Sequence, residues 1–201
     1  EAGDTVVVAA GTYSESVTID KALTLRSEDG ADVTTIDGGT GSNAIAITVR
    51  GSVAEAINVT GVTVEGFTVK TGESYAHDER GIVLHYANDC VIRNNRAMNN
   101  WRGISLEGNT WDNDISRNYM TGNKMGVSLQ YTDGDTVRYN TVVEGEWGIY
   151  LNYAASNTCH RNTIETDTIG VFAMYGSANY ITENVISGAS SWGVAVGPNG
   201  G

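Results

Sequence analysis

The second half of the chain repeats one short pattern five times and begins it a sixth time. A glycine opens each repeat, and the next glycine follows after 22 or 23 residues. These glycines are Gly81, Gly103, Gly126, Gly148, Gly170 and Gly193. An asparagine column keeps the same step at Asn95, Asn118, Asn140, Asn162 and Asn184. Two residue types that hold one register over several repeats indicate a solenoid, in which each repeat forms one turn.

The apolar residues indicate which kind of solenoid this is. Each repeat begins with an alternating pair such as Ile82 and Leu84, and two further apolar residues flank its asparagine. Alternation with a period of two is typical of strands, and no repeat holds a helix-length amphipathic run. A leucine-rich repeat of similar length would need leucines at several fixed places. We therefore predict an all-β fold, a single parallel β-helix of about nine coils stacked about 4.8 Å apart.

Both columns are expected to be structural. Asparagines stacked coil upon coil can bond to one another through their side-chain amides, which satisfies polar groups inside the stack. Asn140 should therefore be buried and bonded to Asn118 and Asn162. The glycines are interpreted as marking a turn into the first strand of each coil.

The whole chain, residues 1–201, is predicted to form one domain in three parts. Residues 1–40 supply the opening coils, and residues 81–201 supply the regular repeats. Residues 41–80 continue the strands less regularly, with Phe67 aligned on the asparagine column and inserts at 50–56 and 71–80. Long inserts on a solenoid often carry binding, although a passive surface loop is the commoner case.

Composition excludes some partners. The net charge is −12 and there are three lysines, which argues against nucleic acid and anionic membrane. No stretch is long enough for membrane insertion, and we expect no signal peptide among these residues. Cys90 and Cys159 are expected three coils apart, about 14 Å along the axis, which exceeds disulfide reach. Both are interpreted as core residues.

The opening stretch GDTVVVAAGTYSESVTIDKALTLRSEDGADVTTIDGG resembles the first coil of extracellular right-handed β-helix proteins. The later repeats, with their N-x-[IV]-x-x-N-x-[IV] pattern, resemble those named after NosD, in the pectin-lyase-like fold. This resemblance implies a right-handed helix and an extracellular or cell-surface location. It does not imply one activity, because the fold hosts lyases, hydrolases, esterases, adhesins and surface-layer proteins.

NosD proteins are associated with copper-enzyme maturation, so the resemblance makes copper a candidate cofactor. Soft copper sites group methionine, histidine and cysteine together. The four methionines share no column with the histidines, so we expect no copper site. The methionines are Met98, Met120, Met125 and Met174.

The sequence nominates no catalytic residue. A galacturonase-like enzyme would need a Gly-His-Gly and a paired Asp motif, and neither is present; His77, His85 and His160 fall on different coils. The densest carboxylates are expected on adjacent turns, at Asp89, Asp112, Asp114, Asp133 and Asp135. The last four are weak candidates for Ca²⁺ ligands, and the group could also serve acid–base chemistry. A solvated acidic edge is the simpler interpretation.

Two surface features could bind a partner. Tyr131, Tyr153 and Tyr175 occupy one position in three consecutive coils, so they should form a row along one edge. Such a row suits a glycan or a protein partner, and stacking for stability explains it equally well. Asn58 heads the sole Asn-x-Ser/Thr sequon and is a glycosylation candidate if the chain is secreted.

The expected function is that of a non-catalytic extracellular β-helix, a structural building block of a surface layer, sheath, filament or adhesin. The alternative is a polysaccharide-binding or polysaccharide-cleaving module. The expected partners are copies of itself or a surface polysaccharide. The first coil, with 5–9, and the last, with 193–196, should present unpaired strand edges. We interpret these ends either as assembly surfaces or as the limits of an excerpt from a longer protein.

Overall fold

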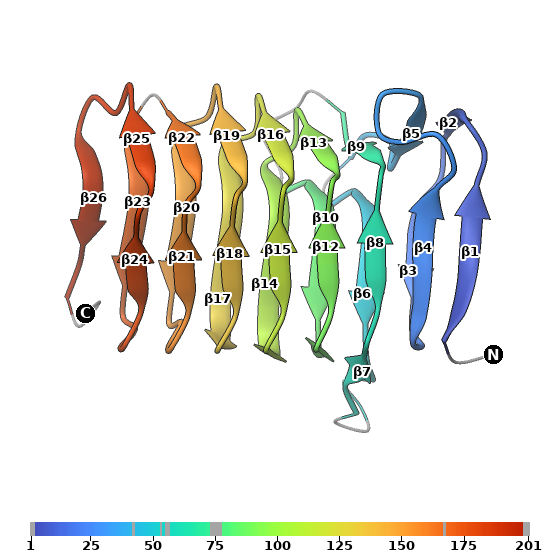
Figure 1. Cartoon of the computed structure of the whole chain (residues 1–201), viewed down its shortest axis with the longest axis horizontal. Coiled ribbons are helices and arrows are strands. Elements are labelled where there is room, and N and C mark those ends of the chain that lie inside the picture. The colour runs from blue at the N-terminus through green and yellow to red at the C-terminus, as the bar shows by residue number, and fades with distance from the viewer. Residues whose placement is uncertain are drawn as a thin grey trace.

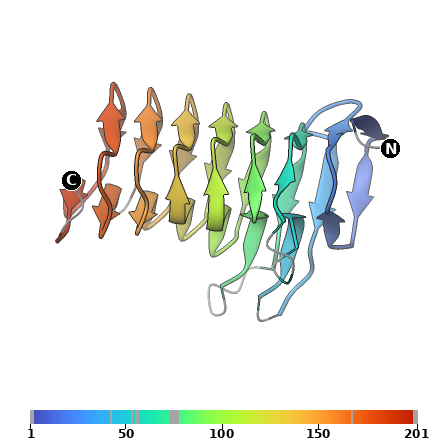
Figure 2. The same ribbon diagram turned by 90° about the horizontal axis from the view of Figure 1, so that it is seen from below.

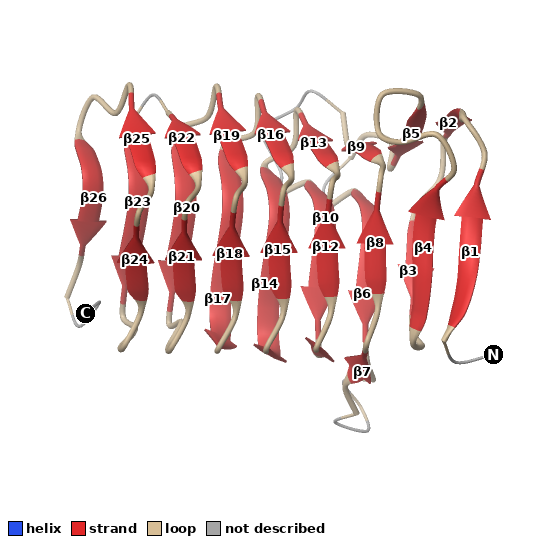
Figure 3. Cartoon of the chain, in the orientation of Figure 1, coloured by secondary structure: helices blue, strands red, loops and turns tan. Residues whose placement is uncertain are grey.

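The computed structural model describes residues 3–41, 43–52, 54, 57–72, 78–166 and 168–198. These residues form strands joined by turns and contain no helix (Figure 3). None of the described segments could therefore cross a membrane as an apolar helix. The all-β prediction is confirmed.

The strands form three parallel sheets, and the chain visits each sheet once per coil (Figure 1). The first sheet contains β1 (Asp4–Val8), β4 (Leu23–Ser27), β8 (Thr63–Glu65), β12 (Val91–Arg93), β15 (Asp114–Ser116), β18 (Thr136–Arg138), β21 (Thr158–His160) and β24 (Tyr180–Thr182). The second contains β2 (Gly11–Tyr13), β5 (Thr34–Asp37), β9 (Thr68–Lys70), β13 (Arg96–Met98), β16 (Tyr119–Thr121), β19 (Thr141–Val143), β22 (Thr163–Glu165) and β25 (Val185–Ser187).

The third sheet has ten strands and the longest members. Its continuous path contains β3 (Val17–Ile19), β6 (Ile45–Arg50), β10 (Arg80–His85), β14 (Arg102–Trp111), β17 (Met125–Asp133), β20 (Trp147–Asn152), β23 (Ile169–Met174) and β26 (Trp192–Val196). Two short strands, β7 (Val59–Thr60) and β11 (Ala87–Asn88), pair beside it.

The described chain makes eight coils, one fewer than expected, because each sheet receives eight successive strands along its main path. The residues expected to form a ninth coil lie instead in three long connections between strands. Residues 38–44, 51–58 and 71–79 lie between consecutive strands and add no coil. The second connection includes an antiparallel bridge between Ser52 and Ile57, and β7 at its end projects beyond the body (Figure 1).

The predicted repeat is also the observed pairing register. Ile82 pairs with Ile104, and Ile104 pairs with Val127 in the next strand. In the 23-residue step from Gly103 to Gly126, the pairing of β14 with β17 shifts between Glu107 and Thr110. The extra residue is thus absorbed by an irregularity in one strand, and the coils on either side remain aligned.

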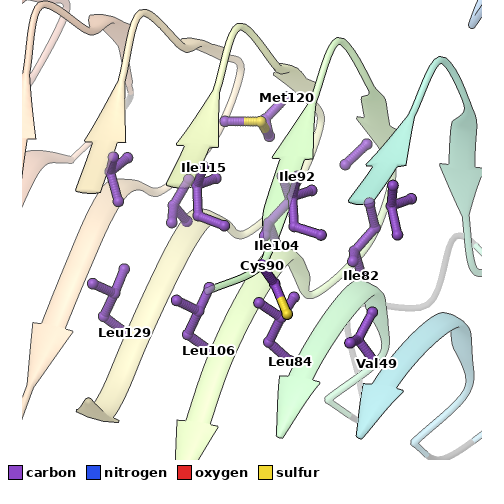
Figure 4. Close-up of a cluster of buried hydrophobic side chains, with 14 of the residues drawn as sticks. Val49, Ile82, Leu84, Cys90, Ile92, Ile104, Leu106, Ile115, Met120 and Leu129 are labelled. Carbon is purple, nitrogen blue, oxygen red and sulfur yellow. The ribbon is translucent and has the colours of Figure 1, made fainter. Parts of the chain in front are cut away.

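The predicted alternating pairs point into a single core that runs along the stack. Figure 4 shows this order: Val49, Leu84, Leu106 and Leu129 follow one another in successive coils, and all are completely buried. Parallel sheets bury such rows because each coil covers the one before it. Figure 2 shows the same succession of layers from another side.

Not every apolar residue in or beside the strands faces the core. Val33 is 50% exposed because Thr34, which begins β5, takes the inward position. Ile57 is 58% exposed because it belongs to the projecting connection. Val6, Val194 and Val196 are also exposed, since they lie in the first and last described coils.

The glycine column has a different cause from the one predicted. These glycines lie within the strands of the third sheet and do not adopt left-handed backbone. A Cβ atom on Gly126 would lie 2.7 Å from the Gly148 carbonyl oxygen and 2.4 Å from Val142 Cγ1. Gly81, Gly103, Gly148 and Gly170 meet the next coil in the same way. The column therefore records a close approach of backbones, which only glycine permits.

Gly126→Ala should consequently destabilise the fold by about 1–3 kcal/mol, the usual cost of overpacking a filled interior. Denaturant unfolding of the variant measures this change. Gly193→Ala is the matched control from the same column, because its nearest neighbour would be 3.9 Å away. Equal loss of stability in the two variants would contradict the steric explanation.

Candidate functional site

The predicted asparagine ladder is present and continuous. From Asn95 to Asn162, each side-chain Nδ2 donates to the Oδ1 of the asparagine one coil later, at 2.9–3.3 Å, and the backbone N–H donates to the same oxygen. Each Nδ2 also donates to a carbonyl of the preceding coil, as Asn140 does to Ile115. Phe67 begins the ladder as predicted, with its N–H donating to Asn95 Oδ1. The ladder is structural, because its side-chain amides bond to one another and to the backbone of neighbouring coils.

Two further ladders were not predicted. One joins Thr71, Asn100 and Asn123. The other runs through Cys90, Asn113, Asp135, Asn157 and Asn179. The signal was available in the sequence, because these asparagines also recur at 22 or 23 residues. The chain therefore has buried polar columns at more than one corner of the coil.

Asn140→Leu should cost about 1–3 kcal/mol, because it leaves buried donors of Asn118 without an acceptor. Thermal or denaturant unfolding against the wild type measures the loss. An unchanged stability would show that the ladder bonds contribute nothing net.

In the ladder from Cys90 to Asn179, Asp135 occupies a position that an asparagine would otherwise fill. Its Oδ1 accepts from the Nδ2 and N–H of Asn113 at 2.9 and 3.0 Å, as an asparagine oxygen would. Its Oδ2 stands where an asparagine would carry its amide donor, and it is buried without a normal hydrogen bond. Burial raises the pKa of Asp135 to about 7, against the hydrogen bonds that Asn113 donates to it, and the nearby Asp112 adds to the rise. Asp135 is thus part of the scaffold rather than an exposed calcium ligand.

Asp135→Asn should remove a pH dependence of stability. The folded-state pKa lies above the unfolded value, so wild-type stability from this group is full below about pH 4 and falls until about pH 7. A rise of this size corresponds to at most about 4 kcal/mol. The variant should therefore be more stable than the wild type at pH 8 and similar to it near pH 4. Unfolding across this range, with exposed Asp133→Asn as control, measures the difference; parallel curves for wild type and Asp135→Asn would refute the assignment.

The other predicted calcium ligands do not assemble around one point. Asp114 is held by Arg138 through two hydrogen bonds of 3.0 and 2.9 Å. Asp112 and Asp133 are exposed, and Asp112, Asp114 and Arg138 line a shallow pocket. Among the residues that the structure describes, no group of three or more histidine, cysteine or acidic side chains could hold a metal ion.

The predicted tyrosine row is present. Tyr131 and Tyr153 stack with centroids 5.0 Å apart, and Tyr153 and Tyr175 stack at 4.9 Å. The rings remain 60%, 48% and 41% exposed. Because they lie face to face, Tyr153 has no free ring face, and the row presents mainly edges and hydroxyl groups. Stacking also stabilises three residues that adopt left-handed backbone.

The candidate glycosylation site is already engaged. Asn58 Nδ2 donates to Asn88 Oδ1 at 2.7 Å and to the Asn109 carbonyl at 2.9 Å. A glycan on this nitrogen replaces one of its two hydrogens, so it would displace one of these bonds.

A polar cluster, unpredicted from the sequence, lies on the outer face of the ten-stranded sheet. Arg102 Nη1 donates to Glu107 Oε1 at 2.8 Å, and Arg102 Nη2 lies 3.2 Å from Asp78 Oδ1. Arg80 pairs with both Asp78 and Glu107. Asp78 and Arg80 arrive from the 71–80 insert, of which residues 73–77 lie outside the described chain. Arg102 and Glu107 come from β14.

Several atoms of this cluster lack a hydrogen bond although they are buried. Ile104 and Leu106 point into the core, so Ser105 between them faces outward, beneath the Arg102–Glu107 pair. Ser105 is nonetheless fully buried, and its Oγ has no partner. Arg102 Nε is also buried without a partner. Asp78 Oδ1 and Arg80 Nε make no hydrogen bond of good geometry, but each is held in an ion pair, with Arg102 at 3.2 Å and with Glu107 at 3.3 Å. Buried polar atoms without partners are rare in folded proteins, and a concentration of them in one place suggests a site for a ligand or water.

An aromatic patch continues the same face toward the C-terminal coils. Trp147, Tyr150 and Phe172 lie with their ring centroids 5.1–5.9 Å apart, in tilted or edge-on pairs. Such pairs leave ring faces open, unlike the stacked tyrosines. Gln130 and Ser128 of β17 lie between the patch and the polar cluster and bond to each other. From β10 to β23 the face extends about 19 Å at the usual strand spacing.

Toward the N-terminal coils the face continues into an open pocket of about 640 Å³. Thr18 and Asp20 line it on one side, and Arg50, Ile57 and Asn58 line it on the other. Arg50 pairs in register with His85, which pairs with Glu107. Burial, Arg50 and Arg80 lower the pKa of His85, while Glu107 opposes them. The imidazole is therefore neutral at pH 7 and can both donate and accept a hydrogen bond.

The stacked parallel sheets and internal ladders define a right-handed parallel β-helix. The profile of the family described as "Periplasmic copper-binding protein (NosD)" matches residues 2–196. The chain therefore belongs to the NosD family, in agreement with the resemblance of its repeats. A periplasmic or extracellular location fits this family description, which does not specify the cell surface. No curated protein sequence matches the chain.

Solved structures share the fold at low identity. A mutant DFA-IIIase from Arthrobacter chlorophenolicus A6 in complex with DFA-III is 13% identical, with a TM-score of 0.60, over 91% of this chain and 56% of that one. An alginate lyase from Paenibacillus sp. str. FPU-7 is 13% identical (TM-score 0.57; 99% and 93% covered), and a pectin methylesterase from Yersinia enterocolitica is 10% identical (0.53; 92% and 86%). This chain thus spans just over half of the DFA-IIIase. These likenesses show the fold alone.

The described residues do not fit the copper in the family's description. Burial raises the pKa of Cys90 to about 11 and of Cys159 to about 12, so neither supplies a thiolate. Met120 is enclosed in the core. His85 and His160 lie on different sheets, and His77 lies outside the described residues. Among the described residues, histidine, cysteine and acidic side chains form no group of three or more that could hold a metal ion.

Proposed function

We propose that this chain is a saccharide-binding β-helix of the periplasm or extracellular space, and that it holds a sugar chain along the outer face of the ten-stranded sheet. The observation that carries the proposal is the continuity of that face. A polar cluster with unpartnered atoms, a bridging Gln130 and Ser128, and the aromatic patch succeed one another along the stack. A sugar ring offers apolar C–H faces to aromatic rings and hydroxyl groups to polar side chains, so it suits both halves.

The fold relatives support a saccharide as ligand. Pectin and alginate, in the names of two of them, are polysaccharides, and each of these two proteins has more than four fifths of its length covered by this chain. The proposal concerns binding. The charged groups of the polar cluster are paired with one another, and no residue is assigned a role in bond cleavage.

A second candidate is the structural building block expected from the sequence. The exposed edges of Tyr131, Tyr153 and Tyr175 favour it, because aromatic rows also suit protein contacts. This role predicts association of the chain with copies of itself. Sedimentation analysis of wild type and a Tyr153→Ser variant would reveal whether association occurs and depends on this row.

Trp147→Ala should weaken binding to a saccharide panel at least tenfold, about 1.4 kcal/mol, because it removes a central ring of the aromatic patch. Calorimetry or an immobilised glycan panel measures the affinity. Tyr180→Ala is the control: Tyr180 is an exposed aromatic residue on the first sheet. If no saccharide binds the wild type, or if both variants bind equally, the outer face of the ten-stranded sheet is not the site.

A further inference from the structure

Two buried atoms of the polar cluster have neither a hydrogen bond nor an ion-pair partner. Arg102 Nε can only donate, and Ser105 Oγ can donate or accept. The charged groups around them are paired with one another, Arg80 and Arg102 with Asp78 and Glu107.

A hydroxyl group suits these two atoms without disturbing the ion pairs. It can accept a hydrogen bond from Arg102 Nε, it can donate to or accept from Ser105 Oγ, and it brings no charge.

The charges of the cluster lead to the same conclusion. Arg80 and Arg102 are matched by Asp78 and Glu107, which leaves the cluster with no net charge. An anionic ligand would have to displace a carboxylate from an arginine already paired with it. The net charge of −12 also repels a polyanion at long range.

We infer that the outer face of the ten-stranded sheet takes an uncharged saccharide rather than a uronic-acid polymer. Its polar cluster recognises adjacent hydroxyl groups as a charge-balanced unit. This inference rests on the proposed function and narrows it. Although pectin and alginate appear in the names of fold relatives, the charge arrangement of this chain opposes such acidic polymers.

The test compares neutral oligosaccharides, such as cello- and manno-oligosaccharides, with oligouronates of equal length. Titration calorimetry at about 50 and about 500 mM NaCl separates hydrogen bonding from charge attraction, because salt screens the latter. Wild type should bind a neutral oligosaccharide with an affinity that changes less than about threefold between the two salt concentrations. It should bind oligouronates at least tenfold more weakly.

Glu107→Gln keeps the shape of the side chain and frees one positive charge of Arg80 or Arg102. This variant should lose at least tenfold in neutral-saccharide affinity and should gain oligouronate binding that falls with salt. Glu65→Gln is the matched control, because Glu65 pairs with Arg93 on the first sheet. Melting curves establish that each variant is folded; should Glu107→Gln unfold, the wild-type comparison still decides between the classes.

Wild-type binding of oligouronates in preference, weakening with salt, would overturn the inference and leave saccharide binding on this face standing. Binding of neither class would overturn both. Neutral-saccharide binding that Glu107→Gln leaves unchanged would also overturn it, because the polar cluster would then not be the recognition element.

Discussion

The hydrogen bonds that pass from one ladder side chain to the next are the constraint on which this fold depends. A thin stack of coils has corners where the backbone turns and the chain cannot pair as a sheet. At these corners the ladder amides serve the buried N–H and carbonyl groups of neighbouring coils, as Asn140 does for Asn118 and Ile115. A buried polar group is tolerated only when it is paired, so every coil must supply the side chain that its neighbour needs. The repeat length is held at 22 or 23 residues for that reason.

This internal regularity leaves the outer face of the ten-stranded sheet free to vary. Ile82, Ile104 and Val127 are nearly interchangeable inside, while the outward residues of the same strands change from charged to polar to aromatic along the stack. Where Ser105 and Ser128 occupy the outward position, long side chains lie over them; where Tyr150 and Phe172 occupy it, the rings themselves form the surface. Recognition can thus be changed residue by residue without altering the coil.

The sequence allowed the fold to be predicted because the fold is a repetition. The Asn95 to Asn184 column, the inward pairs and the position of Phe67 all follow from the period. The polar cluster did not follow, because half of it, Asp78 and Arg80, comes from the end of a non-repeating insert and is placed by tertiary contacts with β14. A partial signal existed: Arg80 and Arg102 stand just before their glycines, where later coils have Met125, Trp147 and Ile169. The sequence suggested a surface position for the Asp135 carboxylate, because Asp112, Asp114 and Asp133 lie close to it in the chain. Its step of 22 residues from Asn113 and from Asn157 shows the column to which it belongs.

The direction of the ladder bonds has a consequence for how the chain is made. The backbone N–H and one Nδ2 hydrogen of Asn118 are accepted by Asn140, which is synthesised later, whereas its own oxygen serves the earlier Asn95. During synthesis from the N-terminus, the newest coil therefore always carries donors that await the next one. Each added coil satisfies that demand and renews it one layer further on. A coil docked in the wrong register would bury these donors without an acceptor. Growth of the stack therefore selects the correct register at each coil.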